Sequence, residues 1–126
     1  MSCLMSHARV LTTAIVPALS SLLLGIDGAY AHAHLERAEP RVESTVTPAP
    51  HEVSLWFTEG LEMAFSTVEV RDAAGARVDE GEAQVSGRTM RIGLKALPPG
   101  TYKVLWHALS VDTHKTEGTF SFRVGK

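Results

Sequence analysis

The chain has 126 residues, a length that allows one domain and little more. Its 12 Lys and Arg residues against 14 Asp and Glu residues give a formal net charge of −2, which argues against a nucleic-acid-binding protein with a clustered basic excess. The composition, 44% hydrophobic and 21% charged, excludes a disordered chain, and the single cysteine excludes an intramolecular disulfide, an all-cysteine zinc site and an iron–sulfur cluster within one chain. Six histidines are the unusual count in so short a sequence.

Residues 1–31 have the features of a secretory signal peptide. A short start containing Arg9 leads into a mostly apolar stretch, 10–26, and residues 29–31 read Ala-Tyr-Ala, an A-x-A cleavage site. A retained membrane anchor is the alternative, but Pro17 interrupts the apolar stretch, and a bilayer span needs about 20 apolar residues. We therefore expect cleavage after residue 31 and export of the mature protein.

The expected mature domain is 32–126. It keeps five of the six histidines and loses the only cysteine, Cys3, so it would work in an oxidising compartment without disulfides. No linker rich in Pro or Ser divides it, which favours a single domain.

Hydrophobic residues in this domain recur with a period of two, which is typical of half-buried strands. Val53, Leu55 and Phe57, for example, share one face of such a segment. Residues with turn chemistry separate the segments. In chain order the expected strands are 33–37, 52–58, 67–71, 81–85, 89–94, 101–108 and 119–124, with turns at 72–75, 86–87 and 97–100. About seven short strands predict an all-β, immunoglobulin-like Greek-key sandwich or barrel.

Cleavage after residue 31 would make His32 the N-terminal residue. Its α-amine, with a reference pKa of about 7.7–8.0, would deprotonate readily beside a metal ion. The amine and the imidazole Nδ1 of the same residue can then chelate one ion. Two nitrogens held in a plane suit Cu(II), which favours tetragonal sites with nitrogen and oxygen ligands.

A second group of metal-binding residue types lies at Asp112-Thr113-His114. Residues two apart on an extended segment point the same way, so the carboxylate of Asp112 and the imidazole of His114 can face one ion. Together with His32 they would supply three nitrogens and one oxygen. The alternative is an ordinary turn residue followed by a solvated imidazole, because periodicity alone does not bring this segment to His32.

Several stretches of the mature domain carry a resemblance to a known family. They are His32-Ala-His-Leu35 followed by Glu39-Pro40, then VSLWFTEG at 53–60, Phe65-Ser66, and PGTYKVLWHALSVDTHKTEGTFSF at 99–122. With these motifs the chain from residue 32 to its end resembles the CopC family of periplasmic copper-resistance proteins. The resemblance implies a small Greek-key β-barrel or sandwich and one tight Cu(II) site per chain, with His32, Asp112 and His114 as ligands.

Three further side chains are candidates for the surroundings of this site. Glu59 stands where the family has an acidic residue, and it either hydrogen-bonds the coordinating amine or is an exposed carboxylate at a strand end. His34 is either an additional ligand or an edge-strand residue, and we favour the latter because four donors complete a Cu(II) plane. For His107 a supporting or packing role is favoured over coordination.

Some members of the family carry a methionine-rich loop that binds Cu(I). The mature domain has only Met63 and Met90. One thioether in the segment around Met63 does not make a site, and Met90 alternates with Ile92 as a core residue would. A Cu(I) site is therefore not expected.

These observations favour a non-enzymatic Cu(II) carrier or buffer in copper resistance, homeostasis or uptake. The resemblance implies an inner-membrane copper transporter of the CopD type as a partner, and we expect a monomer. A copper-dependent oxidative enzyme resembling a lytic polysaccharide monooxygenase is the alternative, but it needs an open coordination position that Asp112 would fill. A metal-free immunoglobulin-like interaction domain is a third possibility.

Overall fold

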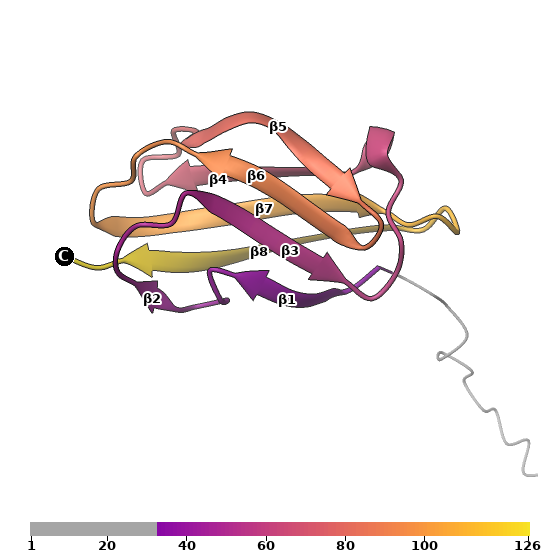
Figure 1. The fold of residues 1–126 in the computed structure, drawn as a ribbon, viewed down its shortest axis with the longest axis horizontal. Coiled ribbons are helices and arrows are strands. Elements are labelled where there is room, and N and C mark those ends of the chain that lie inside the picture. Colours follow the sequence, from indigo (N-terminus) through magenta and orange to yellow (C-terminus); the bar gives the residue numbers. More distant parts are fainter. Residues whose placement is uncertain (1–32) are drawn as a thin grey trace, which may run out of the picture.

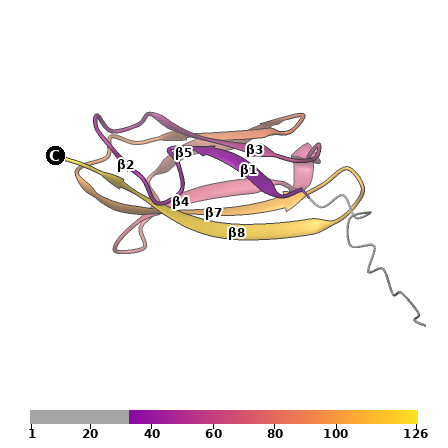
Figure 2. The same ribbon diagram turned by 90° about the horizontal axis from the view of Figure 1, so that it is seen from below.

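The computed structural model describes residues 33–126, which fold into two four-stranded β-sheets packed face to face (Figures 1 and 2). The elements in chain order are β1 (Leu35–Glu39), β2 (Thr45–Val46), β3 (Glu52–Phe57), the short 3₁₀ helix η2 (Met63–Phe65), β4 (Thr67–Asp72), β5 (Asp79–Ser86), β6 (Thr89–Leu94), β7 (Gly100–Leu109) and β8 (Lys115–Val124). Within this range no helix is long and apolar enough to cross a membrane.

The first sheet has the strand order β1-β3-β6-β5 and the second has the order β2-β8-β7-β4. All pairs are antiparallel except β2 with β8. Among the described strands, sequence neighbours pair with each other only in β5–β6 and β7–β8, and the other connections pass between the sheets. Such connections are typical of Greek-key sandwiches, and they confirm the predicted fold class.

The core lies between the sheets and is built by the predicted alternation. Val53, Leu55 and Phe57 of β3 are all fully buried, and Met90 of β6 is buried beside them as expected. Phe57 meets Trp106 of the opposite sheet edge to face, with ring centroids 5.0 Å apart. This arrangement suits the electrostatics of two aromatic rings and joins the two sheets.

The structure differs from the prediction most in two strands, and β1 also lies two residues later than expected, at Leu35–Glu39 rather than 33–37. β2 was not expected, because two residues are too few for a periodic pattern. β8 begins at Lys115 rather than at residue 119. Its first part was not predicted, because Gly118 occupies an inward position where the pattern would need an apolar residue. The indole ring of Trp106 covers that glycine, and a Cβ atom there would lie 2.5 Å from Cζ2 of the ring.

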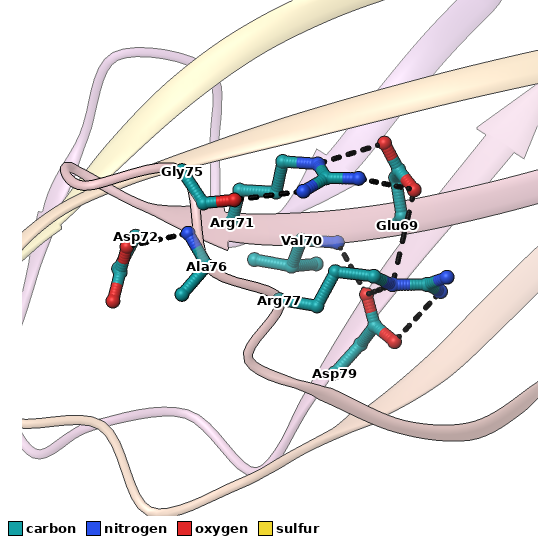
Figure 3. Close-up of polar contacts among 8 residues, drawn as sticks. All are labelled: Glu69, Val70, Arg71, Asp72, Gly75, Ala76, Arg77 and Asp79. Atoms are coloured by element: carbon teal, nitrogen blue, oxygen red, sulfur yellow. Dashed lines mark hydrogen bonds and ion pairs between the residues drawn. The ribbon is translucent and has the colours of Figure 1, made fainter.

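The connection from β4 to β5 is held by charged side chains (Figure 3). The buried carboxylate of Asp79 accepts hydrogen bonds from the Val70 amide at 2.7 Å and from Arg77 Nη2 at 2.9 Å, and this pairing raises the pKa of Arg77. Glu69 forms a second ion pair with Arg71 at 3.0 Å. A buried carboxylate needs such partners, and here they close the edge of the sandwich beside β4 and β5.

Candidate metal centre

Three segments far apart in the sequence meet at one end of the sandwich. They are the start of the described chain, the β3–β4 connection with η2, and the β7–β8 turn, and all lie at the end opposite the C-terminus (Figures 1 and 2). His34 donates its amide to Thr58 Oγ1 at 3.0 Å, and Thr58 returns its own amide to the His34 carbonyl at 2.9 Å. The Val111 amide reaches the Gly60 carbonyl at 3.0 Å, which ties the turn to the same connection.

Asp112 and His114 lie on the turn between β7 and β8. The Thr113 amide donates to the Ser110 carbonyl at 2.9 Å, and the Ser110 amide donates to the His114 carbonyl at 3.0 Å. Thr113 has a positive φ of 72°, an unusual conformation for a β-branched residue. The pattern is that of a three-residue hairpin loop whose last residue is left-handed.

This turn brings the two predicted ligands together. His114 Nδ1 lies 3.2 Å from Asp112 Oδ1. Their proximity does not arise from the alternation of an extended segment, as the sequence pattern suggested, because the backbone reverses between them. The left-handed residue at position 113 turns the chain so that both side chains lie on one side.

The electrostatics of the turn favour an ionised carboxylate. A hydrogen bond from the Ser110 hydroxyl lowers the pKa of Asp112, and hydrogen bonds from the side chain and amide of His114 lower it further. The side chains of Asp112 and His114 are 34% and 43% exposed, whereas His114 Nδ1 itself is buried. A deprotonated carboxylate beside an imidazole is a donor set that suits a divalent transition metal.

Among the described residues, Asp112 and His114 form a candidate ligand pair. Between residues 33 and 126 no three His, Cys, Asp or Glu side chains are grouped closely enough to hold an ion. The predicted ligand His32 lies outside the described residues. Its neighbour Ala33 is fully buried, and its carbonyl accepts a hydrogen bond from Thr116 Oγ1 at 2.6 Å. Thr116 is the second residue of β8, directly after the turn.

The other predicted residues fall in different places. Glu59 is half-buried at the same end, between Thr58 and Gly60. His34 is exposed there, joined to Thr58 through its backbone. His107 instead lies on the outer face of β7, where its Nδ1 is 3.1 Å from Glu117 Oε2.

Three hydroxyl side chains at this end were not predicted from the sequence, those of Thr58, Ser110 and Thr116. Each bonds a segment that bears a candidate ligand or adjoins one. Ser110 carried a weak signal, because serine hydroxyls in turns bond to nearby groups of the same turn. Thr58 and Thr116 carried none, since their partners are distant in the chain.

The sequence is similar to one family model and to several known proteins. A family model described as the CopC domain matches residues 35–125. The chain is 34% identical over 123 residues to Protein YobA of Escherichia coli K12, covering 94% of this chain and 98% of that protein. It is 32% identical over 101 residues to the copper transport protein CutJ of Bacillus subtilis, covering 77% of this chain but 19% of that longer protein.

A solved structure shares the fold. It is the crystal structure of PcoC, described as a methionine-rich copper resistance protein from Escherichia coli. The two chains superpose with a TM-score of 0.66 at 32% sequence identity, over 75% of this chain and 99% of that one.

Proposed function

This chain belongs to the CopC family, and from that premise we propose that it is an exported Cu(II) carrier or buffer that binds one copper ion through His32, Asp112 and His114. The amine and imidazole of His32 would supply two nitrogens, and the other two residues would supply a carboxylate oxygen and a third nitrogen. The observation that carries the proposal is the hydrogen bond from Thr116 to the Ala33 carbonyl. It ties Ala33, the residue that follows His32 in the chain, to β8 directly after the turn that bears Asp112 and His114.

The proposal includes a processing step. Residues 1–31 act as a signal peptide, and 32–126 is the copper-binding domain released into the periplasm. Only cleavage directly before His32 frees the amine that the site uses. Export thereby creates the ligand set and keeps the precursor from binding copper in the same way.

We further propose that copper is bound as Cu(II) and not as Cu(I). Met90 is fully buried in the core, and Met63 is 70% exposed on η2, so the two thioethers are not presented together. Cu(I) sites rely on several soft sulfur ligands, whereas the donors at this end of the sandwich are nitrogen and oxygen. We propose that Glu59, which is half-buried at this end, accepts a hydrogen bond from the His32 amine.

A carrier role is preferred here over oxidative catalysis. Oxygen chemistry at copper requires a coordination position open to the reactant. The carboxylate of Asp112 lies beside His114 and would occupy such a position. The copper transport and copper resistance names of CutJ and PcoC agree with this choice.

The name of CutJ, a copper transport protein, agrees with a partner in copper transport. The region similar to this chain makes up 19% of that copper transport protein, so most of CutJ is additional sequence. We propose that this chain, acting as a monomer, exchanges copper with a separate inner-membrane transporter of the CopD type that corresponds to such additional sequence.

The decisive experiment compares the mature form, which starts at His32, with a form that keeps one residue before it. In the extended form His32 has no free amine. Loss of a hydrogen bond to a metal ligand lowers metal affinity by about tenfold to hundredfold, and loss of a ligand should lower the Cu(II) affinity by more than that. Competition with a chromophoric chelator measures both affinities. His114→Ala should weaken binding as well.

His51→Ala serves as the matched control for His114→Ala. His51 is an exposed histidine in the loop before β3, and its backbone carbonyl bonds the Leu94 amide. This variant should bind copper as the wild type does. Equal affinities for the mature and extended forms would refute the N-terminal site.

A further inference from the structure

We propose that Ser110 is the positioning residue of this copper centre: its hydroxyl holds the carboxylate of Asp112 and the backbone of His114 in place before the ion binds. The inference rests on the proposed function, since it concerns the same site. Ser110 itself is not a ligand in this proposal. Its role is to decide how two ligands are presented.

Ser110 is fully buried, and its hydroxyl lies in the middle of the turn. The hydroxyl donates to Asp112 Oδ1 in a short hydrogen bond and accepts from the His114 amide at 3.3 Å. The same amide lies 3.3 Å from Asp112 Oδ1, so serine oxygen, carboxylate and amide form one closed group. A buried hydroxyl that both donates and accepts a hydrogen bond restricts the rotation of the carboxylate to which it donates.

The backbone of Ser110 is anchored independently of its hydroxyl. Its amide donates to the His114 carbonyl, and it forms a bridge with Leu61 of the β3–β4 connection. Removal of the hydroxyl should therefore leave the turn in place while it frees the Asp112 side chain. This separation allows positioning to be tested apart from folding.

Ser66 offers a matched control within the same end of the sandwich. It is 4% exposed, and its hydroxyl accepts from the Leu109 amide at 3.1 Å, one residue before Ser110. Both serines are thus buried, and both bond the same stretch of chain. Of these two serines, only Ser110 has a hydroxyl that bonds the side chain of a candidate ligand.

The experiment uses mature wild type, Ser110→Ala and Ser66→Ala. Cu(II) affinity is measured by chelator competition at one pH, and the electron paramagnetic resonance spectrum of the copper-loaded protein reports the equatorial ligands. Ser110→Ala should lose about tenfold to hundredfold in affinity and show an altered spectrum, as is usual when a ligand loses its hydrogen-bonding partner. Ser66→Ala should keep the wild-type affinity and spectrum even where its thermal stability falls.

A measurement on metal-free protein completes the test. Three-bond NMR couplings of the Asp112 β-protons should indicate one rotamer in wild type and Ser66→Ala, and averaging in Ser110→Ala. Unchanged couplings, or a copper affinity that Ser110→Ala and Ser66→Ala share, would overturn the inference. If wild type itself binds no Cu(II), the proposed function fails, and the couplings still decide whether Ser110 positions Asp112.

Discussion

Tyr102 is a single residue whose surroundings make a stability prediction. Its ring is buried and stacks on Phe122, with centroids 5.6 Å apart, and its hydroxyl donates to the Pro98 carbonyl. Burial raises the pKa of this phenol, and the nearby carboxylate of Asp72 raises it further. The folded state therefore favours the neutral phenol over the phenolate.

The sign of the resulting pH dependence follows from that shift. The contribution of Tyr102 is fully present below the unfolded-state pKa of about 10 and is lost as the pH rises through the higher folded-state value. Alkaline unfolding followed by circular dichroism should show this loss in wild type and not in Tyr102→Phe. At neutral pH that variant should be about 1 kcal/mol less stable, because it lacks the hydrogen bond to Pro98.

Direct titration provides the check on this prediction. Tyr102 is the sole tyrosine between residues 32 and 126, so the ultraviolet absorbance of phenolate reports it alone in the mature form. An unshifted midpoint in the folded protein would contradict the argument from burial.

At the scale of elements, the β7–β8 hairpin connects the core to the candidate site. The hairpin runs from the C-terminal end of the sandwich to the turn with Asp112 and His114 (Figure 1). Trp106 and Gly118 are partners across it, and the indole lies over the glycine. Close contact between these two residues lets a large ring fill the core just below the turn.

Gly118→Ala should destabilise the fold. The added methyl group would meet the Trp106 ring, and overpacking of this kind costs about 1–3 kcal/mol. Gly93→Ala in β6 is the matched control, because a Cβ there would meet only the Glu80 carbonyl oxygen, at an ordinary 3.5 Å. Urea unfolding should show a loss for Gly118→Ala alone. Equal stability of the two variants would mean that Trp106 moves aside without cost.

At the scale of the whole molecule, the proposed ligands come from opposite ends of the domain's sequence. His32 precedes β1, whereas Asp112 and His114 precede β8, and only the folded sandwich would bring them to one ion. A ligand that binds the folded state alone stabilises it by mass action. Copper binding and folding should therefore be coupled in this protein.

Thermal unfolding of the mature form should shift upward with Cu(II). At a free concentration about one hundred times the dissociation constant, the gain is about 2.7 kcal/mol. The form with one residue before His32 should shift much less at the same concentration, and a chelator should reverse both shifts. Identical shifts in the two forms would show that the amine does not contribute.

Much of the fold followed from local pattern. The alternation of Val53, Leu55 and Phe57 predicted β3 and its buried face correctly, and Met90 proved to be core. β2 was missed because its two residues pair with β8 from a distant part of the chain. The early part of β8 was missed because Gly118 breaks the apolar alternation, and the Trp106 ring lies over that position.

The candidate site was predictable in its chemistry and less so in its geometry. The residue types at 112 and 114 indicated a ligand pair, but the left-handed Thr113 that brings them together was not evident from a β-branched residue. The ligand roles of His32, Asp112 and His114 remain predictions for the experiments above.

The sequence by itself determined most of the strands, the turns and the kinds of donor atom, because the periodicity of side chains and the chemistry of residues are local properties. Only the tertiary structure decided that the segment beginning at Ala33, the β3–β4 connection and the β7–β8 turn meet at one end. That meeting depends on hydrogen bonds between residues distant in the chain, such as Thr116 to Ala33 and Val111 to Gly60. No local pattern encodes them, since they follow from which strands pair across the two sheets.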